Sequence, residues 1–140
     1  MSDLYVVSCS AKKVWEGHRA KPYLPAKQAY VGKTFQEFRR YAEAKGLKWE
    51  ILSGKYGFIE PDHPIGWYDV YLGSLGSIDA ESLLAQTVQL RLYRGRYFRL
   101  VDFNPIWVVN CDPVYSQYLQ NAFPGKDVRE FDRREFTQTA

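Results

Sequence analysis

Residues 52–58 read Leu52-Ser53-Gly54-Lys55-Tyr56-Gly57-Phe58, and this stretch decides how the rest of the chain is organised. The short apolar run at 49–52 predicts a β-strand that stops at the first glycine. Glycine can take backbone angles closed to other residues, and it lets a bound group approach the main chain. Between the glycines, Lys55 offers a positive charge with three donors and Tyr56 a flat ring with a hydroxyl. We therefore expect a binding site where this strand ends.

The segment that follows, residues 60–71, is called the central loop here. It is rich in proline, glycine and aromatic residues. A shorter loop would be enough to connect two elements of the fold, and long loops of this kind often carry functional residues. The alternative is a rigid loop packed by its own rings. We expect both descriptions to hold.

The length of 140 residues suits a single domain, residues 1–140. The chain is 46% hydrophobic and 25% charged, an ordinary globular composition that argues against disorder. Its net charge of +3 is unevenly spread, because residues 1–58 hold 11 Lys and Arg against 5 Asp and Glu. A basic N-terminal half favours an anionic partner, either nucleic acid or a nucleotide, with DNA expected before RNA. The alternative is a solvated basic face.

Cysteine and hydropathy patterns exclude several classes of protein. Cys9 and Cys111 form neither a disulfide framework nor a metal-binding spacing, so we expect no metal and no cofactor. No signal peptide precedes Leu4, and no apolar run approaches the ~20 residues of a membrane span. The sequence predicts a cytoplasmic protein without a membrane partner. For Cys9, a small buried thiol is favoured over a nucleophile.

Strand and helix patterns alternate along the chain. Strands are predicted at 4–8, 49–52, 106–110 and 127–131, with helices at 33–45, from 77 or 79 to 88, and from 113 to about 122. This order predicts an α/β domain with a central, mostly parallel four-stranded sheet and helices on both faces. After the second helix, basic and aromatic residues interleave over 91–99. That pattern fits a strip facing nucleic acid, or a fraying helix end whose rings pack inward.

Three predicted strands end in reactive chemistry: Ser8-Cys9-Ser10, Ser53-Gly54-Lys55 and Asn110-Cys111-Asp112. Ligands of such sheets bind outside the carboxyl ends of the strands. If the strands are neighbours, the three segments meet at one edge of the sheet. This convergence favours a site there more than any single motif does.

Three motifs along roughly residues 4–120 carry a family resemblance. They are Ser8-Cys9-Ser10-Ala11-Lys12-Lys13, Pro25-Ala26-Lys27-Gln28-Ala29-Tyr30-Val31-Gly32 with Phe35, and the stretch from Leu52 to Pro61 with Tyr68-Asp69. They resemble a prokaryotic family of unknown function that is often described beside phage and DNA-modification genes. Their order is similar to that of the YaaA family, peroxide-stress proteins reported to bind DNA. More remotely, it resembles the uracil-DNA-glycosylase-like domain of archaeosine-type tRNA-modifying enzymes. The chain holds no candidate for the helix-hairpin-helix segment of the YaaA proteins.

Three residues are candidates for catalysis. Asp69 is flanked by rings that could desolvate it, and it could orient water or stabilise an oxocarbenium-like sugar. Its alternative role is a turn aspartate that bonds local backbone amides. Lys55 could meet a phosphate or a departing base, and Asn110 could read a base edge or tie strand ends together.

The remaining candidates are binding residues. Strand-end hydroxyls, lysines and glycines are candidates for holding phosphate: Ser8, Ser10, Lys12, Lys13, Lys27, Ser53, Gly54 and Gly57. One ring of the 52–58 stretch and three rings of the loop at 60–71 are candidates for base stacking: Tyr56, Trp67, Tyr68 and Tyr71. We expect a protein that recognises a nucleobase, modified or not, in the manner of a DNA glycosylase that hydrolyses an N-glycosidic bond. The alternatives are a non-catalytic DNA-binding or stress-response protein of YaaA type and a small-nucleotide hydrolase.

Overall fold

The computed structural model describes residues 2–9, 13 and 23–137. Its helices are α1 (Ala26–Ala29), α2 (Lys33–Lys45), α3 (Ala80–Thr87) and α4 (Pro113–Ala122), with 3-10 turns at Leu100–Asp102 and Arg133–Glu135. Its strands are β1 (Leu4–Ser8), β2 (Leu24–Pro25), β3 (Trp49–Ser53), β4 (Gly57–Ile59), β5 (Pro64–Ile65), β6 (Arg91–Tyr93), β7 (Arg96–Phe98), β8 (Ile106–Val109) and β9 (Val128–Glu130). Among the described residues, no helix is long and apolar enough to cross a membrane.

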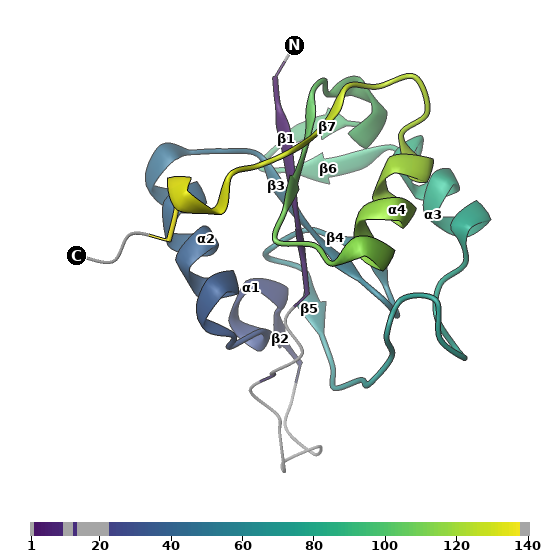
Figure 1. Ribbon diagram of the computed structural model, residues 1–140, viewed down its shortest axis with the longest axis horizontal. Coiled ribbons are helices and arrows are strands. Elements are labelled where there is room, and N and C mark those ends of the chain that lie inside the picture. Colours follow the sequence, from purple (N-terminus) through teal and green to yellow (C-terminus); the bar gives the residue numbers. More distant parts are fainter. Residues whose placement is uncertain (1, 10–12, 14–22, 138–140) are drawn as a thin grey trace.

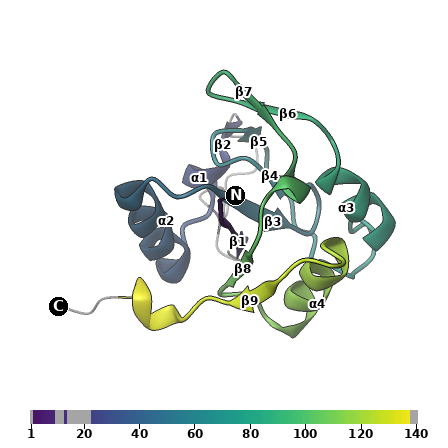
Figure 2. The same ribbon diagram turned by 90° about the horizontal axis from the view of Figure 1, so that it is seen from above.

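Five strands form the main sheet, in the order β4-β3-β1-β8-β9 (Figure 1 and Figure 2). β1 lies at the centre and runs parallel to β3 and β8, and β9 runs parallel to β8. β4 is antiparallel to β3, to which the 53–57 turn joins it. The prediction of four strands was therefore incomplete. β4 has only three residues and begins at Gly57, so it has no hydrophobic pattern of its own.

The sheet has two buried faces with helices on both of them (Figure 2). Along β1, Val7 packs with the side chains of α2, whereas Val6 packs with those of α3 and α4. Both valines are fully buried, as expected for a central parallel strand covered on both sides. This arrangement leaves the carboxyl ends of β3, β1 and β8 side by side at one edge of the domain.

The helix ends follow local capping chemistry. The Asp112 carboxylate accepts a hydrogen bond from the Tyr115 backbone N–H at 2.9 Å, and Pro113 occupies the first turn of α4. Gly46 ends α2 with φ at +63°. Both ends match the sequence prediction.

Residues 91–98 form a two-stranded β-hairpin rather than the end of a helix, so that alternative was wrong. Arg94 and Gly95 make the two-residue turn with φ of 50° and 78°. Positive φ at both positions is the geometry of the turn that matches strand twist, and glycine supplies it readily at the second. Because arginine rarely adopts this conformation, the turn has no strong signal in the sequence.

Candidate functional site

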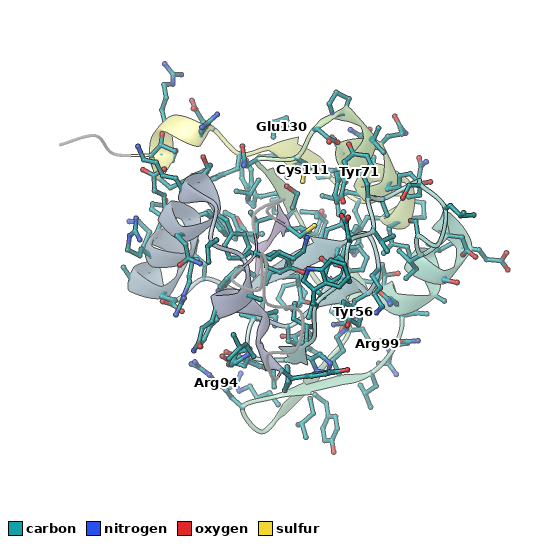
Figure 3. The ribbon with its side chains drawn as sticks, turned by 90° about the horizontal axis from the view of Figure 1, so that it is seen from below. Tyr56, Tyr71, Arg94, Arg99, Cys111 and Glu130 are labelled. Atoms are coloured by element: carbon teal, nitrogen blue, oxygen red, sulfur yellow. The ribbon has the colours of Figure 1, made fainter. Side chains whose placement is uncertain are left out.

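A small cavity of about 230 Å³ opens at the carboxyl ends of β1 and β8. It is lined by residues from both strand ends, from α4 and from the central loop: Ser8, Cys9, Lys13, Asp69, Val70, Tyr71, Asp112 and Tyr115. Figure 3 views the molecule along the strands, from the end where β1 finishes, and it shows Tyr71 and Cys111 close to one another in this view. Four predicted site residues, Ser8, Lys13, Asp69 and Tyr71, are thus brought together in one cavity.

Two carboxylates line the cavity, and they differ in what they contact. Asp112 accepts hydrogen bonds from the Tyr71 hydroxyl and from the Tyr115 backbone N–H. The hydrogen bond to Asp112 raises the pKa of Tyr71 to about 12, so the phenol keeps its proton at neutral pH. Asp69 is exposed to solvent. A ligand can therefore reach the Asp69 carboxylate without breaking the hydrogen bonds of Asp112.

The sequence analysis placed Asp112 in one of the three strand-end segments but did not name it as a candidate for catalysis or binding. One oxygen of the Asp112 carboxylate caps α4, and the other accepts the hydroxyl of Tyr71, which is 41 residues away. The signal that could have found it was its position directly after the Asn110-Cys111 strand end.

A buried network of hydroxyls lies beneath the cavity. Ser53 Oγ donates to the Tyr68 hydroxyl at 2.9 Å, and the hydroxyl oxygens of Tyr68 and Tyr30 lie 2.5 Å apart. Burial raises the pKa of both phenols well above the usual range. Tyr68 is only 3% exposed. It is a core residue in this structure and cannot act as the stacking platform that the sequence suggested.

Lys13 contributes the positive charge of the cavity. Its ammonium group lies 4.6 Å from the centre of the Tyr68 ring, a cation–π geometry. Its backbone forms an isolated β-bridge with Tyr30, and the residue is 9% exposed. The Tyr68 ring therefore holds a lysine rather than a base.

The two cysteines differ in their access to the cavity. Cys9 lines it, with Sγ 3.7 Å from the Tyr115 hydroxyl, which in turn accepts the Leu72 backbone N–H at 3.1 Å. Cys9 is half-buried, so it is less enclosed than the sequence suggested. Burial, together with the nearby Glu130 carboxylate, raises the pKa of Cys111 to about 12. A thiol that holds its proton so firmly is a poor nucleophile.

The glycines and serine of the 53–57 turn have structural contacts that hold the central loop. Ser53 Oγ accepts the backbone N–H groups of Lys55 and Tyr56, both at 3.1 Å. A side chain at Gly54 would place its Cβ only 2.3 Å from the Val70 carbonyl oxygen. Gly57 has φ of +75°, and a Cβ there would meet the Gln86 side chain at 2.3 Å. The loop that supplies Asp69 is thus docked on the turn that organises the sequence.

We expect Gly54→Ala to lower the free energy of unfolding by about 2 kcal/mol or more, because the neighbour it would strike is backbone. Gly66→Ala is the matched control. Its Cβ would lie 3.0 Å from the ring of Tyr23, an exposed side chain that can turn aside, so we expect a loss below about 1 kcal/mol. Urea unfolding of both variants measures the difference. Equal stability of Gly54→Ala and the wild type would show that the loop is not held by this contact.

The other predicted site residues that the structure describes do not line the cavity. Lys55 is exposed, and its ammonium group lies 5.2 Å from the centre of the Tyr56 ring. Asn110 is exposed with φ of +51°, and its carbonyl oxygen accepts the Ser8 hydroxyl at 2.8 Å. Lys27 forms an ion pair with Asp62 at 2.6 Å. Tyr56 and Trp67 are half-buried, and the predictions for Ser10 and Lys12 lie outside the described residues.

The described residues contain no group of three or more His, Cys, Asp or Glu side chains that could hold a metal ion. Direct ligand contact at this site would therefore come from Asp69, Lys13 and the hydroxyl groups of Ser8 and Tyr71. These groups can bind a polar ring, orient a water molecule and balance a single charge.

Residues 4–97 match a family of unknown function, DUF6884. The chain belongs to this family. The match covers β1, the 53–57 turn and the central loop, and therefore Ser8, Asp69 and Tyr71, whereas Asp112 and Tyr115 come after it.

One curated relative of this DUF6884 member is the uncharacterized protein YfjM of Bacillus subtilis (strain 168), with 36% identity over 75 residues. The aligned region is 53% of this chain and 50% of YfjM, so the chain spans about half the length of the curated relative it matches. No solved structure matches the chain. The resemblance to YaaA proteins and to uracil-DNA-glycosylase-like domains stays a prediction.

Proposed function

We propose that this protein recognises a nucleobase within nucleic acid, DNA before RNA, and hydrolyses its N-glycosidic bond in the manner of a DNA glycosylase. One observation supports the proposal most: the accessible carboxylate of Asp69 shares a small cavity with Lys13 and Tyr71 at the carboxyl ends of the central strands. A carboxylate, a cation and a ring are the groups that such a reaction needs around one sugar and one base.

The size of the cavity supports a small, flat ligand. Its volume of about 230 Å³ is below the range of roughly 300–1,000 Å³ found for drug-sized ligands. One ring system suits this volume better than a dinucleotide cofactor. A base in a duplex would reach it only by leaving the stack, at a cost of a few kcal/mol that contacts in the cavity offset.

In this mechanism Asp69 orients a water molecule or stabilises the positive charge that develops on the sugar. Tyr71, at 50% exposure, offers a ring beside the base at the rim. Lys13 takes the part that the sequence assigned to Lys55, because its charge lies in the cavity, and it stabilises the negative charge on the departing base. Asn110 is the candidate for reading a base edge from the adjacent strand end.

A specific observation favours non-catalytic binding as the second candidate. The Asp112 carboxylate is already bonded to Tyr71 and to the first turn of α4, which leaves Asp69 as the cavity carboxylate without a hydrogen bond or ion pair to any residue that the structure describes. A DNA-binding or stress-response protein of YaaA type would use the same cavity to hold a base or phosphate without cleaving it.

The experiment incubates the protein with DNA that carries varied and hypermodified bases and detects abasic sites by alkali cleavage. Cleavage of at least one substrate is the expected result. A broad panel without abasic product, together with binding that weakens steeply as salt rises, would replace the enzyme with the binder. Binding of nucleotides alone, with no salt-dependent binding of a polymer, would favour a small-nucleotide hydrolase.

A further inference from the structure

The β6–β7 hairpin forms a second surface that the cavity chemistry does not use. It lies toward the N-terminal end of β1, away from the carboxyl ends of the strands (Figure 1). Between residues 91 and 99 the sequence holds four arginines and no acidic residue. In the view along the strands, Arg94 and Arg99 lie on the side of the molecule opposite to Tyr71 and Cys111 (Figure 3).

A groove of about 540 Å³ runs between this hairpin and the N-terminal end of β1. Five aromatic rings line it: Tyr5, Tyr93, Tyr97, Phe98 and Phe103. This volume falls within the range of roughly 300–1,000 Å³ of ligand pockets, and more than twice the volume of the Asp69 cavity is available. Lys48 Nζ lies 4.6 Å from the centre of the Tyr93 ring and 4.3 Å from the centre of the Phe98 ring, so Tyr97, at 69% exposure, is the ring that the groove leaves open to a ligand.

The charges around the groove favour an anion. Lys48, in the groove wall, is neutralised by Glu50 and Glu60 at 3.1 and 2.6 Å. Asp3, also in the wall, accepts the Trp107 indole N–H at 2.9 Å. Arg96 lines the groove and Arg94 lies at the adjoining turn, and neither forms an ion pair with any residue that the structure describes. Arg94 lies over the Tyr93 ring at 5.1 Å, and the two guanidinium groups together outweigh the one negative charge of Asp3.

The hairpin also exposes apolar side chains that water does not favour. Tyr97 is 69% exposed and its cross-strand partner Leu92 is 57% exposed. The two-residue turn at Arg94 and Gly95 presents them on a short strand pair with a defined twist. An exposed ring beside arginines that form no ion pair with the described residues is a combination with which proteins hold unstacked bases and their phosphates.

We propose that this groove binds a single-stranded segment of nucleic acid, with a base stacked on Tyr97 and phosphates on Arg94 and Arg96. A single strand fits better than a duplex, because paired bases cannot present their faces to the rings. The inference rests on the nucleic-acid partner of the proposed function, and it is independent of cleavage in the Asp69 cavity.

Fluorescence anisotropy with a labelled oligothymidine of about 12 nucleotides tests the groove, since single-strand sites span about 4–16 nucleotides. Tyr97→Ala should weaken binding at least about fivefold, the lower end of what one stacked base contributes. Tyr23→Ala is the matched control, because Tyr23 is also 69% exposed but lies outside the groove. Arg96→Gln should weaken binding and reduce the salt slope by about 0.7, the value for one phosphate contact on a single strand. Arg40→Gln, on the exposed side of α2, should change neither.

Failure of the groove and failure of the cavity give different results. If Tyr97→Ala and Arg96→Gln bind the oligonucleotide with wild-type affinity, the proposal for the groove is wrong. The proposal of a nucleic-acid partner then still stands. A groove that binds as expected in a protein that cleaves no substrate would overturn the glycosylase alone. A wild type that binds no oligonucleotide would overturn the partner on which both rest. A dimer that Tyr97→Ala converts to a monomer, with oligonucleotide binding unchanged, would show that a second copy covers the groove and would also overturn it.

Discussion

Asp69→Asn should reduce glycosidic cleavage by about a hundredfold or more, the scale of a positioned acid-base group. Asparagine keeps the shape of the side chain but can neither accept a proton from water nor balance a sugar cation. A group that acts on developing charge contributes to the transition state far more than to ground-state binding. Because Asp69 is exposed, we expect the melting temperature and the affinity for substrate to stay near the wild-type values. Single-turnover rates of abasic-site formation, with affinity measured on the same DNA, separate the two effects.

Asp132→Asn serves as the charge-matched control for Asp69→Asn. Asp132 is an exposed carboxylate that caps the last 3-10 turn and does not line the cavity. The Asp132→Asn variant should cleave the substrate at the wild-type rate. Full cleavage by Asp69→Asn would leave the enzyme class standing and remove Asp69 from the mechanism.

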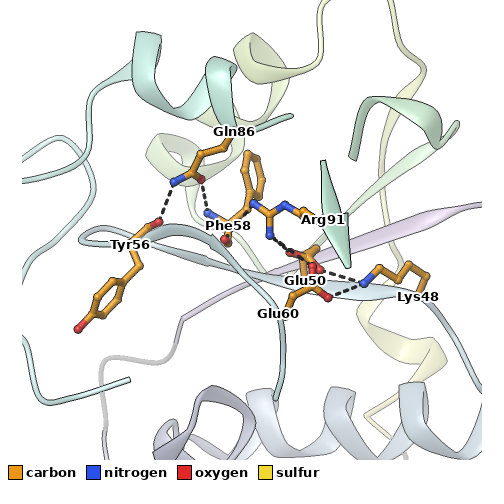
Figure 4. Close-up of polar contacts among 7 residues, drawn as sticks. All are labelled: Lys48, Glu50, Tyr56, Phe58, Glu60, Gln86 and Arg91. Atoms are coloured by element: carbon orange, nitrogen blue, oxygen red, sulfur yellow. Dashed lines mark hydrogen bonds and ion pairs between the residues drawn. The ribbon is translucent and has the colours of Figure 1, made fainter. Parts of the chain in front are cut away.

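Arg91→Met should cost about 3–5 kcal/mol of unfolding free energy, because the buried carboxylates of Glu50 and Glu60 lose one of their two cationic partners. Arg91 Nη1 lies 3.1 Å from Glu50 Oε1 and 3.3 Å from Glu60 Oε2, and Lys48 bridges the same two carboxylates from the other side (Figure 4). The Glu50 side chain is fully buried, and those of Glu60 and Arg91 are each only 15% exposed. Solvent therefore screens this cluster little. Guanidinium chloride unfolding measures the loss, and Arg96→Met, at an exposed arginine of the same hairpin, should cost less than about 0.5 kcal/mol.

The loss in Arg91→Met should depend on pH. Burial, and then the hydrogen bond with Glu60, raises the pKa of Glu50 well above its ordinary value. A carboxyl group with a raised folded pKa contributes stability below its unfolded pKa, and that contribution disappears as pH rises through the folded pKa. Burial acts in the same direction on Glu60, but the hydrogen bond with Glu50 and the charge of Lys48 hold the pKa of Glu60 below its ordinary value. Removing Arg91 raises both pKa values, so the variant should lose more stability at pH 8 than at pH 5. An equal loss at both pH values would mean that neither carboxylate depends on the guanidinium for its charge.

The central part of the fold could be predicted because its signals are local. The apolar runs of β1, β3 and β8 marked three buried strands, and the chemistry at their ends pointed to the edge where the cavity lies. Asp69 and Tyr71 were identified from the composition of their loop. Their joining with Ser8 and Lys13 was not predicted, because the rule for parallel sheets places strand ends and not the residues of a loop.

Other features depend on contacts between residues far apart in the sequence. Tyr68 looked like a stacking ring until its hydroxyl was found bonded to Ser53 and Tyr30 in the core. The groove could not be foreseen, because the turn that builds the β6–β7 hairpin places an arginine at positive φ. A ring in a loop does not reveal whether it faces solvent or the core.

The short strand β4 has a consequence for how molecules of this protein meet. An edge strand normally presents free backbone groups on which another chain can add a strand. Here the Gln86 side-chain amide accepts the Phe58 N–H at 2.8 Å and donates to the Tyr56 carbonyl at 3.0 Å, and Arg91 donates to the Phe58 carbonyl at 3.3 Å (Figure 4). Two side chains thus occupy the positions that a neighbouring strand would take. Gln86 and Arg91 therefore protect the β4 edge of the sheet against edge-to-edge polymerisation, because they form the backbone hydrogen bonds that an added strand would form.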